Sequence, residues 1–295
     1  MAAGCTMLPD VTRPYLNEQR PTLCFFSKHL EKMKYNELGK ELKEAGFAGV
    51  DLTVRPGGHV LPERVAEDLP RAVEAIRSYG LKVPMITTGL TSASDPTARA
   101  VLGTAARLKI PLFKLGYWLY RDDVLSSHRI AGTEVRGLVD LARQFRLVAG
   151  FHNDARCVGL AIWDTDELIR DLDPMWIGYY YDAGNATLDG GASGWEVGLR
   201  LAAPRLKMAA CKDFAWEKIG GQWTAVQCPL GEGMVNWARV FSLLAAARFT
   251  GPISIHQEYR PSDRIAAAHR DLEFVRKHLS AAYGGAVESR TAPVG

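Results

Sequence analysis

Residues 135–154 read VRGLVDLARQFRLVAGFHND, and this stretch decides the fold. Apolar residues recur at helical spacing from Val135 to Phe145, which predicts an amphipathic helix with one face packed on a core. The run Leu147–Phe151 that follows is short and apolar, is typical of a buried strand, and ends at His152. A helix that leads directly into a buried strand is the repeating unit of a parallel sheet with crossover helices.

The same unit recurs along the chain. Strand-like runs alternate with amphipathic stretches at Thr22–Ser27, Phe47–Val54, Lys82–Thr87, Leu112–Tyr117, Leu147–Phe151, Trp176–Tyr181, Leu206–Cys211 and Pro252–Ile255. Because no Gly-x-Gly-x-x-Gly fingerprint follows any of them, the pattern favours a closed barrel over a Rossmann sheet. The sequence therefore predicts an α/β fold, a single (β/α)8 TIM barrel over residues 21–283, with an N-terminal extension over 1–20 and a disordered tail over 284–295.

Composition argues against several classes of protein. The net charge is +3 and no Lys/Arg run is long enough to follow a phosphate backbone, so nucleic acid is not an expected partner. The five cysteines form no C-x-x-C pair, which argues against a zinc knuckle. No apolar run approaches the ~20 residues of a membrane helix, so no membrane span is expected.

The first residues bear on localisation. The stretch Ala3-Gly4-Cys5 matches the end of a lipoprotein signal, but the charged and hydrophobic regions of such a signal are missing. The sequence as written therefore predicts a cytoplasmic protein. The alternative is an exported protein whose leader has been trimmed.

Polar side chains gather at the ends of the predicted strands, which is the rim where TIM barrels carry out their chemistry. They are Arg55 and His59 after the second strand, Lys114 in the fourth, His152 after the fifth, Asp182 and Asn185 after the sixth, Lys212 after the seventh, and His256 and Glu258 after the eighth. Because side chains alternate along a strand, residues two apart share a face. The set His152, Asp182, His256 and Glu258 suits a divalent metal, with Mn, Zn, Co and Mg as candidates.

Each of these residues also has a structural interpretation. A histidine near a strand end is often held by hydrogen bonds alone, Asp182 could cap the segment that follows it, and the Lys212 ammonium could extend to solvent. The coincidence of so many such groups on one rim favours the functional interpretation. Trp216 belongs to a group of aromatic residues near strand ends, which would suit a sugar ring but which core packing also explains.

Several motifs carry a resemblance to a known family. They are Gly-Phe-Ala-Gly-Val-Asp-Leu (46–52), Phe-His-Asn-Asp (151–154), Asp-Ala-Gly-Asn (182–185), Lys-Asp-Phe (212–214), Pro-Leu-Gly-Glu-Gly (229–233) and Gly-Pro-Ile-Ser-Ile-His-Gln-Glu-Tyr (251–259). With them the chain resembles the xylose-isomerase-like superfamily, which holds sugar isomerases, 3-epimerases, inosose dehydratases and endonuclease IV. The resemblance runs from about Leu23 to Leu279.

This resemblance implies one divalent ion bound by a glutamate, an aspartate, a histidine and a second glutamate on strands five to eight. Carried over by position, the first glutamate falls on His152, the aspartate on Asp182, the histidine on Ala210 and the second glutamate on His256. Alanine cannot coordinate a metal. Either the ion is bound by the other three residues together with Glu258, or it has been lost.

The leading hypothesis is an enzyme that removes a proton next to the carbonyl of a small-molecule sugar or keto-sugar, as an isomerase or epimerase does. Catalysis is assigned to His152, Lys212 and Glu258. Substrate binding is assigned to Arg55, His59, Lys114, Asn185 and Trp216. The resemblance also implies a homo-oligomer, since barrels of this superfamily often pair.

Two alternatives stay open. One is a lyase or hydratase that acts on a keto-glycoside by β-elimination, because the mouth lacks the pair of glutamates that would exchange a proton. The other is a sugar-binding or partner subunit without activity, which Ala210 and Asn185 favour. An enzyme like endonuclease IV is disfavoured, since it would need a multi-metal cluster and a basic groove.

Overall fold

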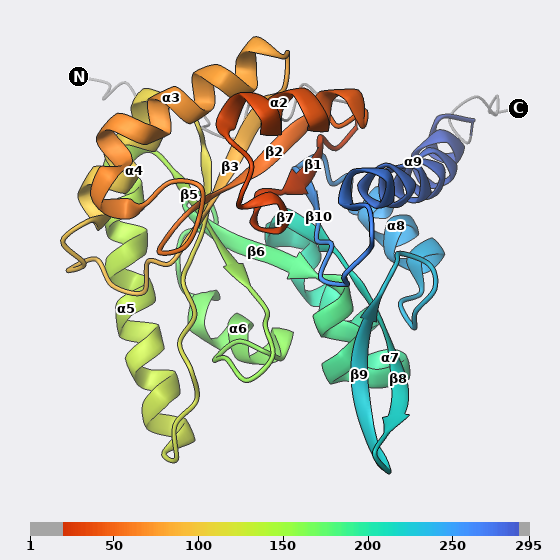
Figure 1. Cartoon of the computed structure of the whole chain (residues 1–295). Coiled ribbons are helices and arrows are strands. Elements are labelled where there is room, and N and C mark those ends of the chain that lie inside the picture. Colours follow the sequence, from red (N-terminus) through yellow and green to blue (C-terminus); the bar gives the residue numbers. More distant parts are fainter. Residues whose placement is uncertain (1–19, 289–295) are drawn as a thin grey trace, which may run out of the picture.

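A computed structural model describes residues 20–288 and confirms the barrel. The strands are β1 (Leu23–Phe26), β2 (Gly49–Val54), β3 (Lys82–Thr88), β4 (Leu112–Lys114), β5 (Val148–His152), β6 (Ile177–Asp182), β7 (Leu206–Cys211) and β10 (Ile253–Ile255). They pair in the closed order β1-β10-β7-β6-β5-β4-β3-β2, and every pairing is parallel. All eight predicted strands are present, and their carboxyl ends meet at one mouth (Figure 1).

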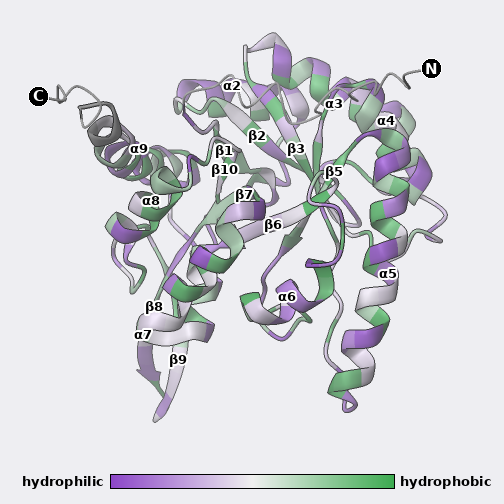
Figure 2. Ribbon diagram, turned by 180° about the vertical axis from the view of Figure 1, so that it is seen from behind, coloured by the Kyte–Doolittle hydropathy of each residue, from purple (hydrophilic) through white to green (hydrophobic). Residues whose placement is uncertain are grey.

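The helices surround the sheet (Figure 1). They are α2 (Tyr35–Glu44), α3 (Val65–Ser78), α4 (Ala98–Arg107), α5 (Val124–Phe145), α6 (Ile162–Ile169), α7 (Ala183–Ala202), α8 (Trp237–Ala246) and α9 (Arg264–Glu288), with short 3-10 turns η1 (Ser27–Leu30), η2 (Pro62–Arg64) and η3 (Ala203–Arg205). In Figure 2, hydrophobic and hydrophilic residues alternate along these helices, as a helix with one face on the sheet requires. No helix within residues 20–288 is long and apolar enough to cross a bilayer.

The boundaries differ from the prediction at the C-terminal end. The helix α9 continues to Glu288, beyond the predicted end of the barrel at residue 283. The rest of the predicted tail, and the N-terminal extension up to residue 19, lie outside the described residues.

The inside of the barrel changes from apolar to polar along the strands. Met85, Leu112, Val148, Tyr180, Met208 and Ala210 form a buried cluster within it. Two residues further along the same strands stand Thr87, Lys114 and Asp182, which are buried and polar. Alternate residues of a strand share a face. On each of these three strands, β3, β4 and β6, an apolar side chain inside the barrel is therefore followed two residues later by a polar side chain at its mouth.

One element was not predicted from the sequence. The strands β8 (Asp213–Ile219) and β9 (Gln222–Cys228) form an antiparallel hairpin that projects from the barrel after β7 (Figure 1). Its two-residue loop is Gly220-Gly221, with φ angles of 57° and 85°. Positive φ at both central positions belongs to the tight hairpin turn that glycine pairs favour, so the signal was present in the sequence.

The Asp213 carboxylate holds the base of this hairpin. It accepts hydrogen bonds from the Trp237 indole (2.7 Å) and from the backbone N–H groups of Phe214 (2.9 Å), Gly231 (3.0 Å) and Val235 (3.2 Å). A Cβ at Gly233 would lie 2.1 Å from an Asp213 carboxylate oxygen, so this loop needs glycine there. The motifs Lys-Asp-Phe and Pro-Leu-Gly-Glu-Gly are therefore joined by a structural contact.

Replacement of Asp213 by alanine is expected to lower the free energy of unfolding by about 3 kcal/mol or more, because four N–H donors lose a charged acceptor. Urea denaturation followed by circular dichroism measures this change. Glu217→Ala, at an exposed position of the same hairpin, is the matched control and should change little. A loss below 1 kcal/mol in Asp213→Ala would contradict the anchoring role.

Candidate active site

Asp182 ends β6 and caps α7, so its two carboxylate oxygens have different partners. Oδ1 accepts a hydrogen bond from the Asn185 backbone N–H at 2.8 Å. Oδ2 faces the barrel axis, 3.4 Å from His152 Nε2 and 3.3 Å from Lys212 Nζ. A Cβ at Gly184 would lie 2.6 Å from the Lys212 carbonyl oxygen, so the glycine lets the two strand ends approach each other. Asp182 therefore caps α7 with one oxygen and leaves the other beside His152 and Lys212.

His152 is the last residue of β5 and is almost completely buried. Its Nδ1 lies 3.2 Å from the Tyr117 hydroxyl and 3.9 Å from Asp154 Oδ2. Its Nε2 and Asp182 Oδ2 have no hydrogen-bond partner of good geometry among the described residues. Two buried polar atoms that face each other in this way are suited to a shared ligand.

His256 follows β10, and its ring stacks on Phe26 with 4.4 Å between centroids. Its Nε2 lies 3.0 Å from the Tyr180 hydroxyl, and that hydroxyl donates its proton to Asp51 Oδ2 at 3.0 Å. Because the phenol has only one proton, the His256 Nε2–H must be the donor in the first contact. The neutral ring therefore keeps its lone pair on Nδ1.

Asp51 was not among the predicted site residues. It lies in β2, is fully buried, and also accepts hydrogen bonds from Thr87 Oγ1 (2.7 Å) and Ser254 Oγ (2.9 Å). Burial raises the pKa of this carboxyl to about 6 despite these hydrogen bonds. Asp51 acts on the site through Tyr180 and His256, and only its place on the inward face of a strand marked it in the sequence.

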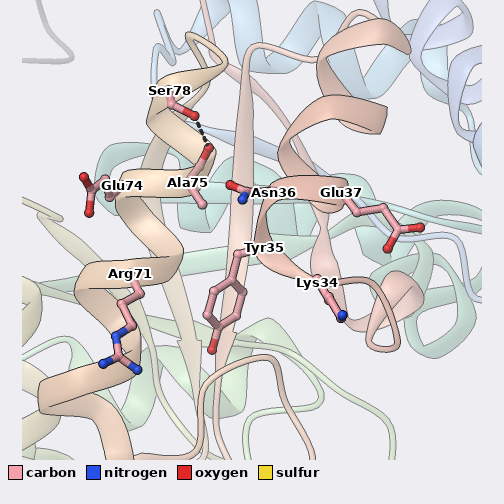
Figure 3. A pocket seen from close by; sticks show the side chains of 8 residues that line it. All are labelled: Lys34, Tyr35, Asn36, Glu37, Arg71, Glu74, Ala75 and Ser78. Carbon is pink, nitrogen blue, oxygen red and sulfur yellow. Dashed lines mark hydrogen bonds between the residues drawn. The ribbon is translucent and has the colours of Figure 1, made fainter.

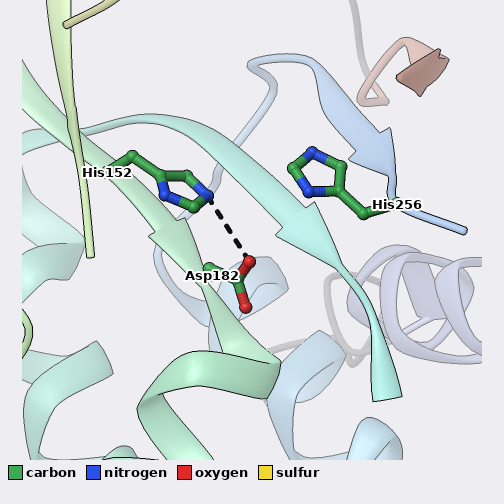
Figure 4. A group of neighbouring side chains, drawn as sticks. All are labelled: His152, Asp182 and His256. Carbon is green, nitrogen blue, oxygen red and sulfur yellow. Dashed lines mark ion pairs between the residues drawn. The ribbon is translucent and has the colours of Figure 1, made fainter. Parts of the chain in front are cut away.

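The chain supplies a group of three metal-donor side chains at the mouth (Figure 4). One donor atom from each of His152, Asp182 and His256 lies within 4.8 Å of the others. Burial lowers the pKa of both histidines, so both are neutral. Burial opposes ionisation of Asp182, but Lys212 and His152 outweigh it and lower the pKa of the carboxyl. Neutral imidazoles and a carboxylate are the states that coordinate a divalent ion, so these residues fit one.

Lys212 keeps its charge beside this group. Burial disfavours the ammonium, but Asp182, Asp154 and Glu258 raise the pKa of Lys212 above its ordinary value. Lys212 thus already neutralises the oxygen that a metal would share. Ala210, two residues earlier, lies in the apolar cluster inside the barrel.

Glu258 lies apart from the three donors. Its carboxylate accepts two hydrogen bonds of 3.0 Å from Lys28 Nζ and lies 3.7 Å from His29 Nε2. It still lines the mouth cavity, which has a volume of about 90 Å³. The structure therefore places Glu258 at the wall of the cavity and not within the group His152, Asp182 and His256.

The cavity gathers some of the predicted substrate-binding residues and not others. Arg55 and Lys114 line it. His59 is held outside it by Thr53 and the Leu30 carbonyl, and Asn185 donates to the Asn153 carbonyl. Trp216 lies on the hairpin and is exposed. Tyr117, Tyr180 and Asp154 were not among the residues assigned to the site from the sequence, but they belong to the cavity wall.

A wider groove of about 660 Å³ lies between α2 and α3, away from the mouth (Figure 3). Charged side chains of both signs line it, among them Lys34, Glu37, Arg71 and Glu74. It brings together no buried polar side chain that lacks a partner, among the residues that the structure describes. The barrel mouth, where such side chains do gather, is therefore the candidate site.

The family model described as a xylose isomerase-like TIM barrel matches residues 40–278. The chain belongs to this family. No curated protein matches the sequence. One solved structure of this fold is a xylose isomerase-like TIM barrel protein from Mycobacterium smegmatis in complex with magnesium. It is 18% identical to this chain, with 90% of this chain and 98% of that chain covered and a TM-score of 0.68.

Two further solved structures have an activity in their names. The 3-keto-D-glucoside 4-epimerase from E. coli is 14% identical, with 88% of this chain and 100% of that chain covered and a TM-score of 0.69. A probable 3-DHS dehydratase from Bacillus anthracis is also 14% identical, with 86% and 98% covered and a TM-score of 0.68. At these identities the likeness establishes the fold.

Proposed function

We propose that this protein removes a proton next to the carbonyl of a sugar or keto-sugar, with a divalent ion held by His152, Asp182 and His256. The observation that carries the proposal is this buried group of three donors, 3.3 Å from the Lys212 ammonium, beside a cavity at the barrel mouth. The ion would supply positive charge next to the substrate oxygens when bound. Family membership and the sugar epimerases of the same fold support the same class of reaction.

The two roles predicted for His152 exclude each other, because the Nε2 lone pair serves either a metal or a proton. Nε2 faces Asp182 Oδ2 at 3.4 Å, which favours ligation. Among the carboxylates that line the cavity, Glu258 is held in place by Lys28, so we assign the proton transfer to it. Lys212 would neutralise the oxygen on which negative charge develops.

The second candidate is β-elimination from a keto-glycoside, which needs only one base. It is favoured by the histidines at positions 152 and 256, where the family resemblance places the two glutamates that exchange a proton. Both histidines belong to the metal group, so neither is free to return a proton to the opposite face. The Bacillus anthracis structure, named as a dehydratase, has the same fold.

Replacement of Glu258 by glutamine is expected to slow proton exchange about a hundredfold, because a general base typically contributes that much or more. The protein, loaded with Mn²⁺, is incubated in D₂O with a panel of ketoses and 3-keto-glycosides. Proton NMR then follows deuterium uptake beside the carbonyl and the formation of isomer, epimer or elimination product. Asp154→Asn, at the other carboxylate of the cavity, is the matched control.

The outcomes separate the assignments. Exchange that persists in Glu258→Gln with the metal still bound would exclude Glu258 as the base. Exchange by the wild type on no member of the panel, with or without metal, would contradict the proposed reaction. An isomer or epimer among the products would support the first candidate, and an unsaturated product would support elimination.

A further inference from the structure

Two cationic side chains of the mouth cavity lack a carboxylate partner. Four cationic side chains line the cavity, Lys28, Arg55, Lys114 and Lys212, and only two carboxylates do, Asp154 and Glu258. Lys28 is paired with Glu258, and Lys212 with Asp182 below the cavity. Within residues 20–288, no carboxylate lies within 4.0 Å of the charged group of Arg55 or Lys114. An excess of positive charge is therefore built into one side of the cavity.

Lys114 is the more unusual of the two. Its side chain is 2% exposed, and Nζ has no hydrogen-bond partner among the described residues. The face of the Tyr117 ring lies against Nζ, with its centroid 3.1 Å away, and the more distant Asp154 and Asp51 carboxylates raise the pKa of Lys114 only partly against the effect of burial. A buried ammonium normally has a hydrogen-bonded counter-ion, because the desolvation of an unpaired charge is costly. Burial, and then Arg55, lower the pKa of Lys114 to about 7, as expected where an anion is missing.

Arg55 supports the same interpretation from the end of β2, which β3 separates from β4. Its guanidinium packs on the Phe26 ring at 5.7 Å from the centroid and lines the cavity with Lys114. Two like charges that face one space repel each other unless an anion lies between them. A guanidinium fork beside an ammonium is a combination that binds carboxylate and phosphate groups.

The approach to the cavity carries the same sign of charge. A groove of about 790 Å³ adjoins it, and Lys28 and Glu258 line both. Lys32, Arg260 and Arg264 face this groove, against a single further carboxylate, Glu31. Such a field attracts anionic ligands and raises their rate of association.

We propose that the substrate carries an anionic group, a carboxylate or a phosphate, which binds between Arg55 and Lys114. The inference rests on the proposed function in taking the mouth cavity as the substrate site. It narrows the substrate from sugars in general to acidic sugar derivatives. The carbonyl end of such a molecule would then face Lys212 and the group His152, Asp182 and His256.

The test compares three ketoses by isothermal titration calorimetry: 2-keto-D-gluconate, D-fructose 6-phosphate and neutral D-fructose. At least one of the two anions should bind the wild type tenfold or more tightly than D-fructose. The one that binds identifies the group as carboxylate or phosphate. Arg55→Met and Lys114→Met should each weaken anion binding about 10- to 100-fold and leave D-fructose binding nearly unchanged.

Arg71→Met removes a cation from the groove between α2 and α3 and is the matched control. Melting temperatures show whether each variant is folded. Arg55 is partly exposed, so Arg55→Met should fold and can test the inference even if Lys114→Met is unstable. Equal affinity of the wild type for D-fructose and for both anions would overturn the inference. So would an anion preference that survives unchanged in Arg55→Met.

The outcome of this binding test does not depend on whether the proposed reaction is confirmed. Anion binding that depends on Arg55 and Lys114, without deuterium exchange on any ketose, would support the inference and contradict the reaction. Deuterium exchange on neutral ketoses, with no preference for anions, would support the reaction and contradict the inference.

Discussion

Replacement of Asp182 by asparagine is expected to lower the affinity for a divalent ion about a thousandfold and to abolish measurable turnover. The reason is that Asp182 Oδ2 is the charged donor of the group, buried between His152 Nε2 and Lys212 Nζ. The asparagine variant is chosen over alanine because Oδ1 caps α7, and asparagine caps a helix as well as aspartate does. Loss of metal would then not follow from loss of the helix.

Elemental mass spectrometry on protein purified without chelators measures the metal content, before and after reloading with Mn²⁺, Zn²⁺, Co²⁺ or Mg²⁺. We expect about one ion per chain in the wild type and none in Asp182→Asn or His152→Ala. Asp123→Asn is the matched control, because Asp123 caps α5 in the same way, with its side chain accepting from the Ser126 N–H, but does not line the mouth cavity.

Each outcome of this measurement decides something about the site. A wild type that binds no metal after reloading would contradict the metal-assisted reaction. His152 would then be free to act as a base. A metal that stays bound in Asp182→Asn would show that the ion lies elsewhere. Asp182 would then only neutralise Lys212 and cap α7.

The fold could be predicted almost completely from the sequence, because barrel strands are buried on both faces and stand out as apolar runs. The run Leu206–Cys211 matches β7 residue for residue. The hairpin β8–β9 was missed because its residues are mostly exposed and carry no apolar period, so only Gly220-Gly221 marked it. The extent of α9 beyond residue 283 was missed because small residues there have no periodicity.

The site could be predicted only in part, since sequence position gives the strand end but not the direction of a side chain. His152, Asp182 and His256 were predicted as a set, and the structure brings them together. Glu258 shares their rim, but Lys28 holds its carboxylate away from them, a pairing between residues 230 positions apart. Tyr180 was predicted only as part of the strand-like run Trp176–Tyr181, and its hydroxyl joins His256 to Asp51.

Replacement of Lys212 by methionine is expected to change activity and metal affinity in opposite directions. Turnover should fall about a thousandfold, because the ammonium lines the mouth cavity and would neutralise the oxygen on which negative charge develops. Metal affinity should rise about tenfold, because Nζ lies 3.3 Å from the Asp182 oxygen and repels any cation that shares it. Methionine keeps the length and packing of the side chain, so the change is mainly one of charge.

These opposite changes in turnover and metal affinity separate two possible roles of Lys212, both of which predict a loss of activity. If Lys212 is a catalytic cation beside a metal, Lys212→Met binds the ion more tightly and yet turns over slowly, with kcat reduced more than KM is raised. If Lys212 is only the counter-ion of Asp182 in a metal-free barrel, its removal leaves a buried carboxylate unpaired and lowers stability by about 3 kcal/mol, with no metal gained. Metal titration and urea denaturation of the one variant therefore decide between a catalytic and a structural lysine, even before the substrate is known.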